Sequence, residues 1–379
     1  MSRRRGNQEG SIYQVSPGRW RAAITVEGGR RKYLFGTTRQ EVAKKLSAAR
    51  IAQDQGLLVT APSQPLERFL DRWLKDSVAN RVRPWTYKGY ESVVRKHINP
   101  TLGNVRLDRL APQQVQALIN QKLESGLAPK TVASILGILR NALGQANRWE
   151  LVSRNVAKLV DPPRQVRHEI QPFTVEEARV LLDAGQTDRL GALYSVALAM
   201  GLRQGEALGL RWKDVDLDLG MLQVMYQLQR INGEAKLVEP KTRLSRRSLA
   251  LPATILFALR EHRQRQLEER LLAGRRWVDS GLVFTSTIGT PLDGTNVTKS
   301  FQRLLARAGL PKRRFHDLRH SCATLLLVQN VAPRVVMEVL GHSQISLTMN
   351  TYSHVLPTLK REAAHQMDAL LRGGRELGD

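Results

Sequence analysis

Two consecutive prolines near the middle of the chain, Pro162 and Pro163, limit how it can fold. Proline cannot continue a helix, and the residue before a proline is held in an extended conformation. Residues 66–159 show apolar side chains at helical spacing only, so the prolines end a helical region and begin an extended hinge. The chain therefore folds in separate parts, and its 379 residues are enough for two or three domains.

The region before residue 60 is predicted to form a small three-stranded sheet followed by one helix. Short alternating runs separated by glycine turns predict strands at residues 11–15, 19–26 and 30–35. Residues 40–55 show helical spacing. The expected apolar side of this helix consists of Val42, Leu46, Ala49 and Ile51. Arg19 and Arg21 share one face of the middle strand. We expect this basic sheet to enter a DNA groove, the alternative being a solvated basic surface.

Residues 60–163 are predicted to form an all-α domain of four or five helices after a proline-containing linker at 60–65. The helices are expected at residues 66–75, 86–97, 112–124 and 129–149. Thr86 is the expected N-cap of the second helix. Basic residues fall between the apolar positions throughout.

Residues 164–379 are predicted to form a mixed, mainly helical α/β domain with a small antiparallel sheet, which makes the whole chain a multi-domain α+β protein. The apolar run 190–200 predicts a buried helix that presents Arg203 just after its end. The strands are expected at residues 221–225, 234–239 and 246–251, with Lys241 in the turn between the last two. Other helices are expected at residues 256–272, 295–309, 316–329, 333–340 and 358–371.

The charge of the chain predicts a polyanionic partner. Lys and Arg number 59 against 34 acidic residues, giving a net charge of +25. Each phosphate that such a protein contacts releases counterions, so the excess favours nucleic acid. The basic residues are spread over the whole chain, which indicates a large footprint on double-stranded DNA.

Cysteine content and hydropathy bear on location. The single cysteine, Cys322, excludes an intramolecular disulfide and is expected to be a buried thiol in a reducing cytoplasm. No apolar run reaches the roughly 18 residues that a membrane span needs. The basic N-terminus has no apolar segment behind it, so we expect no membrane span and no secretory signal.

Six residues in the last part of the chain carry the strongest chemical signal. They are Arg203, Lys241, His316, Arg319, His342 and Tyr352. These are cations, imidazoles and one phenol, without an acidic cluster that could hold a metal ion. This inventory suits attack by a phenolic oxygen on a phosphodiester, with side chains handling the negative charge.

The order of these residues resembles that of the tyrosine recombinase (phage integrase) family. Its pattern is an arginine, a hairpin lysine, His-x-x-Arg, a His or Trp, and a tyrosine, and all six positions are filled here. The layout is similar to that of integrases from temperate phages and integrative elements. The resemblance implies an arm-type DNA-binding domain at 1–59, a core-binding domain at 60–163, and a catalytic domain with a C-terminal tether helix at 164–379. Asn155-Val156 departs from the Asn-Pro frequent in the family, which affects only the linker.

The resemblance and the chemistry of the side chains together assign the main roles. Tyr352 would attack the scissile phosphorus, giving a 3′-phosphotyrosyl bond and a free 5′-hydroxyl. A phenol with a pKa of about 10 needs cationic help for this. Arg203 and Arg319 would clamp the nonbridging oxygens, because a guanidinium fork matches phosphate. Lys241 would protonate the leaving 5′-oxygen.

The remaining residues are expected to assist. His316 would aid proton transfer at the tyrosine, and His342 would donate a hydrogen bond to a nonbridging oxygen. Glu206 resembles the acidic supporting residue of the family, and His320 is expected to be a supporting or structural histidine. Rejoining from phosphotyrosine needs no ATP, and we expect no cofactor and no metal.

Several of these residues also have a non-catalytic interpretation. His316 and His320, at i and i+4, could be a metal pair, Arg203 a helix C-cap, and Lys241 a solvated turn lysine. The favoured function is a site-specific recombinase that acts as a homotetramer on DNA in a bacterial cytoplasm, with accessory DNA-bending and directionality proteins as candidate partners. The alternatives are relaxation of DNA like a type IB topoisomerase, and a DNA-binding protein without catalysis.

Overall fold

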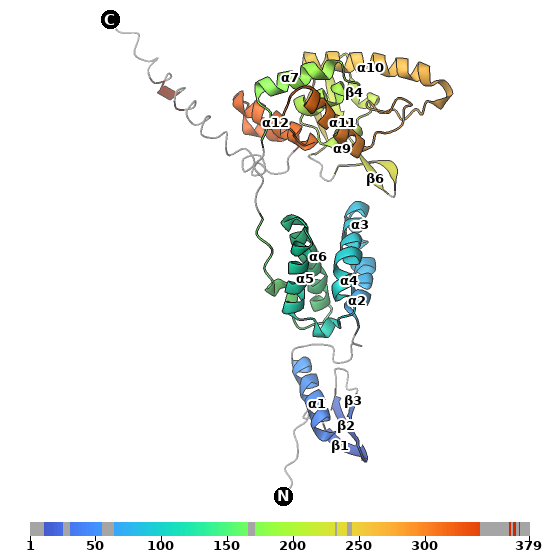
Figure 1. The fold of residues 1–379 in the computed structure, drawn as a ribbon, viewed down its shortest axis with the longest axis vertical. Helices are drawn as coiled ribbons and strands as arrows, with labels where there is room; N and C mark the ends of the chain where they lie inside the picture. The colour runs from blue at the N-terminus through green and yellow to red at the C-terminus, as the bar shows by residue number, and fades with distance from the viewer. Residues whose placement is uncertain are drawn as a thin grey trace. The chain divides into compact units, whose positions relative to one another are not determined.

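The structure is a computed structural model that describes residues 11–25, 31–54, 64–165, 171–231, 233–240 and 245–341, together with residues 364, 367, 368 and 371. Internal contacts divide the chain into two units, Met1–Arg167 and His168–Asp379. The first unit holds two separate hydrophobic cores, one between a sheet and a helix and one among helices. Figure 1 shows these parts of the chain. Among the described residues, no helix has the length and apolar character to cross a membrane.

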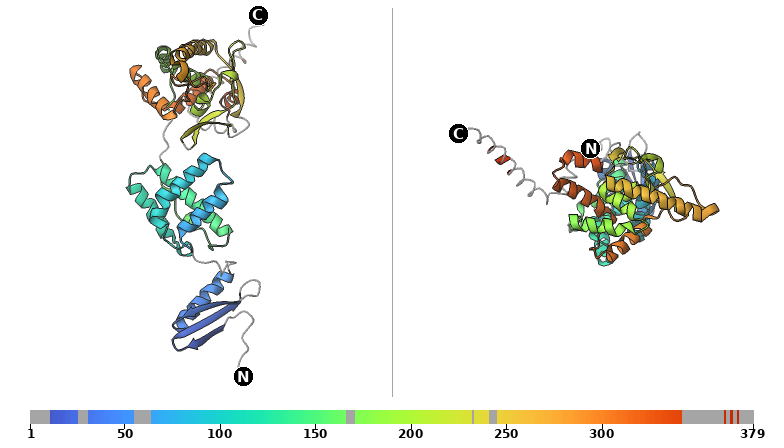
Figure 2. Two further views of the ribbon diagram at one scale, coloured as in Figure 1. Left: turned by 90° about the vertical axis from the view of Figure 1, so that its right-hand side faces the viewer. Right: turned by 90° about the horizontal axis from the view of Figure 1, so that it is seen from above.

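The N-terminal body is an antiparallel sheet with one helix on one face (Figure 2). The strands are β1 (Ser11–Ser16), β2 (Arg19–Thr25) and β3 (Arg31–Gly36), and the helix is α1 (Arg39–Asp54). Its core contains Ala22, Ile24, Val42, Leu46 and Ala49. The predicted sheet and helix are confirmed, but Ile51 was wrongly assigned to the core and is 55% exposed. It lies nine residues after Val42, which is about two and a half helical turns and therefore the opposite side.

The second core belongs to a body of helices. They are α2 (Leu66–Trp73) with the π-helical turn η1 (Leu74–Val78), α3 (Pro84–Val93) with η2 (Val94–Ile98) and α4 (Asn99–Leu102), α5 (Pro112–Glu124) and α6 (Pro129–Arg148), with short 3₁₀ turns η3 (Leu107–Arg109) and η4 (Val156–Leu159). The expected Thr86 cap is wrong, because α3 already begins at Pro84 and Arg83 is its extended N-cap. Proline favours the first helical position, where its fixed φ fits and its missing N–H is not needed.

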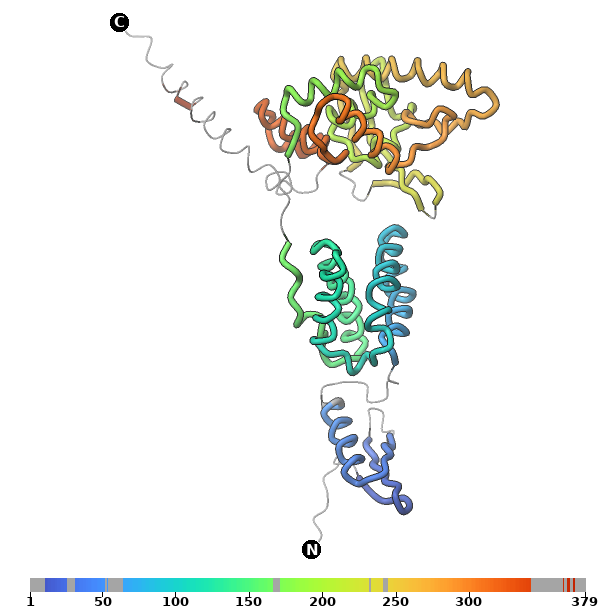
Figure 3. The backbone as a smooth tube through the Cα atoms, viewed as in Figure 1, coloured from blue at the N-terminus to red at the C-terminus, as the bar shows by residue number. Residues whose placement is uncertain are grey.

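A buried helix lies at the centre of the second unit. It is α8 (Gly191–Ala199), which contacts α7 (Val175–Gln186), α10 (Ala253–Ala273) and α12 (Phe315–Val328). A Cβ on Gly191 would overlap the carbonyl oxygen of Gly185 in α7, so only glycine allows this approach. After α10, the chain returns through residues 274–293 to α11 (Gly294–Arg307), as the tube in Figure 3 shows. The helices expected at residues 190–200, 256–272, 295–309, 316–329 and 333–340 are confirmed, whereas most of the helix expected at 358–371 lies outside the described residues.

Two small antiparallel sheets complete the unit. β4 (Val215–Asp216), β5 (Met221–Val224) and β8 (Arg247–Ala250) form one, and β6 (Gln227–Ile231) pairs with β7 (Glu234–Val238) in the other. β6 was missed, although Asn232-Gly233 is a strong hairpin signal and Gly233 has φ +85°. β7 and β8, expected to be joined by one turn at Lys241, belong to different sheets.

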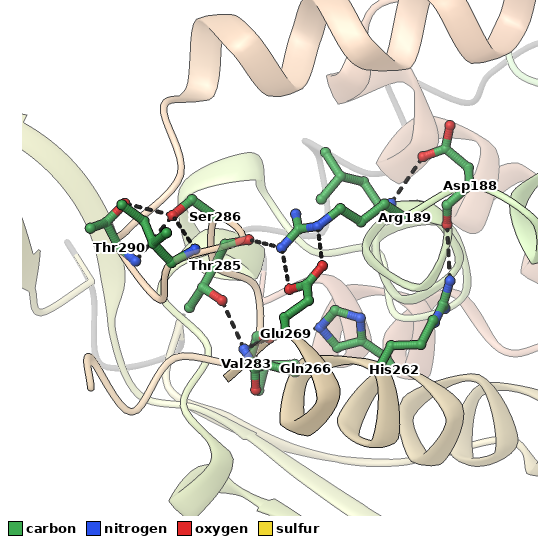
Figure 4. A network of polar contacts seen from close by, with 12 residues as sticks. Asp188, Arg189, His262, Gln266, Glu269, Val283, Thr285, Ser286 and Thr290 are labelled. Atoms are coloured by element: carbon green, nitrogen blue, oxygen red, sulfur yellow. Dashed lines mark hydrogen bonds and ion pairs between the residues drawn. The ribbon is translucent and has the colours of Figure 1, made fainter. Parts of the chain in front are cut away.

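A buried polar network ties α10 to the loop that follows it (Figure 4). The Arg189 guanidinium donates to both carboxylate oxygens of Glu269, at 2.5 and 2.6 Å, and to the Thr285 carbonyl oxygen at 2.9 Å. His262 Nε2 lies 2.8 Å from the Val283 carbonyl oxygen, which the Gln266 amide also reaches at 3.0 Å. These bonds satisfy polar groups that the fold removes from water.

Candidate active site

The structure describes five of the eight residues that the sequence singled out. Arg203, Glu206, His316, Arg319 and His320 are described. Lys241, His342 and Tyr352 lie outside the described residues, as does most of the helix expected at 358–371.

Arg203 begins a helix. It is the N-cap of α9 (Gln204–Leu208), with extended φ and ψ of −68° and 150°. The alternative that Arg203 caps the C-terminus of α8 is therefore wrong, because Gly201, with φ +59°, reverses the chain between the two helices. The Arg203 backbone N–H donates to Glu206 Oε2 at 3.1 Å, and its Nη1 donates to Oε1 at 2.6 Å.

Arg319 reaches the same loop from a different element. It lies in the first turns of α12 and is 2% exposed. Its Nη1 donates to the Gly201 carbonyl oxygen at 2.7 Å. Arg319 is therefore anchored two residues from Arg203, although the two lie 116 positions apart in the sequence. The fold thus brings together two of the predicted phosphate ligands.

A third arginine, Arg247, lies with Arg203 and Arg319 in one group, the arginine cluster, and it was not predicted from the sequence. Its Nη2 lies 3.1 Å from Glu206 Oε2, and the two side chains are 6% and 2% exposed. Burial raises the pKa of Glu206, but the charges of Arg247 and Arg203 outweigh it and hold that pKa below its ordinary value. Arg247 is one of several basic residues that follow Lys241 in the sequence, and spacing alone gives no sign of its burial.

The two described histidines stand next to each other on α12. The rings of His316 and His320 meet edge to face with centroids 5.0 Å apart. The pKa of His316 is lowered, chiefly by desolvation and to a lesser extent by the charges of Arg319 and Arg203. Part of the His316 side chain is still exposed at the surface. The pKa of His320 falls to about 4, chiefly through burial and then through His316. Both rings are neutral at neutral pH, so His316 can accept a proton.

The start of α12, which carries these groups, is held on both sides. Asp317 accepts from the Arg314 backbone N–H at 2.7 Å in a capping box, and it pairs with the Arg314 guanidinium at 2.8 Å. Ser321 accepts a hydrogen bond from the Phe173 backbone N–H at 2.8 Å. Within the described ranges, no three acidic, histidine or cysteine side chains gather as metal ligands would. The arginine cluster instead suits an anion.

A second cationic surface lies on the sheet of the N-terminal body, on the face away from α1. The Arg21 guanidinium lies 4.6 Å from the ring centroids of both Tyr13 and Tyr33. Arg19 lies 5.8 Å from the ring of Phe35, and Tyr33 and Phe35 are 43% and 46% exposed. Large aromatic side chains at the surface between arginines can contact a groove of nucleic acid through both charge and ring faces.

Comparisons with known proteins give matches over most of the chain. Residues 172–358 match the family described as "Phage integrase family", and residues 66–123 match "Phage integrase, N-terminal SAM-like domain". A "Tyrosine recombinase XerC-like" protein from Caldanaerobacter subterraneus is 32% identical over 375 residues, covering 93% of this chain and 96% of that protein. An "Integrase" from Saccharopolyspora erythraea is 28% identical, covering 98% of each chain.

Solved structures with the same fold have been determined on DNA. The Tn1549 transposon integrase in complex with a circular intermediate DNA superposes with a TM-score of 0.69 at 23% identity, over 80% of this chain and all of that one. A lambda integrase tetramer bound to a Holliday junction gives a TM-score of 0.57 at 19% identity, over 88% of this chain and 96% of that one.

Proposed function

This chain belongs to the phage integrase family of tyrosine recombinases, and we propose that its six predicted residues form one centre for DNA cleavage and rejoining. The protein is a site-specific recombinase that breaks and rejoins DNA strands. The observation that carries the assignment of residues is the arginine cluster. Arg203 and Arg319 come from separate elements and are both tied to the short loop that starts at Gly201.

In the proposed reaction, the phenolic oxygen of Tyr352 forms a bond to the scissile phosphorus and the bond from phosphorus to the 5′-oxygen breaks. His316 takes the phenolic proton, and Lys241 gives a proton to the departing 5′-oxygen. Arg203, Arg319 and His342 stabilise the charge on the nonbridging oxygens. A 5′-hydroxyl then attacks the phosphotyrosyl bond, and the proton transfers run in reverse. The phosphotyrosyl bond conserves the energy of the broken phosphodiester bond, so rejoining needs no ATP. The cationic side chains stabilise the negative charge in this scheme.

We assign the three predicted domains to three tasks on double-stranded DNA. Residues 1–59 bind arm-type sites through the sheet face that carries Arg19 and Arg21. Residues 60–163 bind the core site, and residues 164–379 carry out catalysis. The support is the cationic sheet face, the match of residues 66–123 to the SAM-like domain of integrases, and the match of residues 172–358 to the integrase family.

On DNA, we assign the protein a homotetrameric state in the cytoplasm of a bacterial host, assisted by DNA-bending and directionality proteins. The related lambda integrase has been seen as a tetramer on a Holliday junction. The predicted helix at residues 358–371 serves as the tether between protomers. A protein truncated after Pro357 should bind its site as tightly as the full chain and lose coordinated strand exchange. Unchanged recombination by the truncated protein would contradict the tether.

The test of catalysis is trapping of the covalent complex. A nicked duplex is built from the DNA repeats that flank the encoding gene, so that the short cleaved product diffuses away and the adduct accumulates. Wild type should give a protein–DNA adduct stable to denaturant, and Tyr352→Phe should give none while binding the duplex equally. Tyr226→Phe is the matched control, because Tyr226 packs against Arg211 outside the proposed centre.

Each other outcome of this experiment has a defined meaning. An adduct that persists in Tyr352→Phe would assign the nucleophile to another residue. Relaxation of arbitrary supercoiled plasmids without a site would favour topoisomerase-like activity. Tight binding with no adduct at any repeat would favour a DNA-binding protein without catalysis.

A further inference from the structure

Arg247 is an arginine whose bonds all end inside the protein. Its Nη2 donates to Glu206, its Nη1 donates to the Ser245 carbonyl oxygen at 3.1 Å, and its Nε donates to the Val339 carbonyl oxygen at 2.6 Å. The side chain is 6% exposed, so it is not placed to contact a phosphate itself. Any effect of Arg247 on catalysis therefore acts through the groups that it holds.

One of these groups orients Arg203. The Glu206 carboxylate is 2% exposed and accepts from the Arg203 backbone, from the Arg203 guanidinium and from Arg247. A carboxylate paired with Arg203 alone would fix its direction but would also cancel its charge. Because Arg247 also pairs with Glu206, two cations share one anion, and the trio of Arg203, Glu206 and Arg247 keeps a net charge of +1. Arg203 remains 37% exposed and can present that charge outward.

The other group ends a helix. Val339 is the last residue but one of α13 (Pro333–Leu340), and the last carbonyl groups of a helix lack partners within it. A guanidinium satisfies such a carbonyl and favours the negative end of the helix. Gly341, with φ +64°, is the C-cap of α13 and directly precedes His342 in the sequence. Arg247 thus links the orientation of Arg203 to the end of α13.

We propose that Arg247 is a positioning residue for strand cleavage, which lets Glu206 orient Arg203 without neutralising it and which fixes the end of α13. The inference rests on the proposed function. The net charge of the trio matters because Arg203 is assigned to stabilise negative charge that grows on the phosphate in the transition state. A partner that only stabilised the fold would affect the amount of folded protein and not the rate of each folded molecule.

The test compares single-turnover adduct formation on the nicked repeat duplex, corrected for the fraction of protein that binds DNA. Arg247→Gln sets the trio to zero charge and should slow cleavage about tenfold or more, with little change in the dissociation constant of the duplex. Arg247→Lys keeps the charge but loses two of the three bonds. It should cleave faster than Arg247→Gln although the two lose similar thermal stability.

The double variant Glu206→Gln/Arg247→Gln restores a net charge of +1 and should cleave at least about threefold faster than Arg247→Gln alone, since contacting residues couple. Arg189→Gln is the stability control. Arg189 likewise makes three hydrogen bonds within the protein, but to Glu269 and Thr285, so its loss should lower the melting temperature and leave the cleavage rate unchanged.

The outcomes separate this inference from the proposed function. If wild type forms no adduct, the proposed function fails. If wild type forms the adduct and Arg247→Gln forms it at the same rate, Arg247 is not a positioning residue. Equal rates for Arg247→Gln, Arg247→Lys and the double variant, all slower than wild type, would overturn the charge balance and leave the three hydrogen bonds of Arg247 as the cause of the loss.

Discussion

Replacing Gly201 by alanine tests whether the loop that joins the two arginines depends on glycine. Gly201 has φ +59°, where an L-residue is strained by about 1–2 kcal/mol. A Cβ there would lie 2.5 Å from Leu340 Cδ2 and 3.2 Å from Cys322 Sγ, and both of these residues are buried. Overpacking of this kind costs a further ~1–3 kcal/mol. The expected loss of stability is therefore about 2–5 kcal/mol.

Gly309→Ala is the matched control. Gly309 has φ +66° in the same unit, and no atom lies within 4 Å of the position that its Cβ would take. It therefore carries the backbone strain without the clash. The difference between the two variants isolates the packing cost in the pocket formed by Leu340 and Cys322.

The assay is calorimetric melting of the full chain, following the transition of the catalytic unit. A loss of 1 kcal/mol shifts the melting temperature of a domain of this size by roughly 2–4 °C. Gly201→Ala should melt several degrees below Gly309→Ala, and it should also cleave more slowly, because the Gly201 carbonyl anchors Arg319. Equal melting temperatures for the two variants would refute the packing argument.

Two other predictions concern pH and DNA binding. Burial lowers the pKa of His262 to about 4. Between about pH 6.5 and 4, this imidazole is therefore protonated in the unfolded chain and neutral in the folded chain. The contribution of neutral His262 to the free energy of unfolding is fully present above pH 6.5 and decreases as the pH falls, by up to about 3 kcal/mol. His262→Phe keeps the ring contacts with Trp212 and Phe284. In this pH range its unfolding should take up about one proton fewer than that of wild type, so its free energy of unfolding should depend less steeply on pH. An equal slope of that free energy against pH for variant and wild type, measured by urea titration, would exclude His262 as the cause. On arm-site DNA, Arg21→Ala should reduce the slope of log affinity against log salt by about one. Arg50→Ala should leave this slope unchanged, because Arg50 lies on α1 and α1 packs against the opposite face of the sheet. Equal slopes for Arg21→Ala and wild type would exclude the sheet face from the DNA interface.

The local elements were open to prediction because their signals lie within a few residues. Thr174 and Glu177, three residues apart, form a capping box at the start of α7, and the helices of both units follow the spacing of their apolar residues. The failures also have local causes. Ile51 was assigned to the apolar side of its helix but lies on the opposite side, and the Asn232-Gly233 sequence signal for a hairpin was overlooked.

The sequence by itself determined the order of chemically distinct residues from Arg203 to Tyr352, and this order sufficed for the family because a mechanism limits which side chains can occupy each role. The tertiary structure decided which distant groups share a charge or a carbonyl. Arg319 binds the carbonyl of Gly201, and Arg247 is buried against Glu206 and the end of α13. No local pattern encodes such contacts, because the burial of Arg247 follows from how β8, α9 and α13 pack, and spacing along one element carries no information about its neighbours in space.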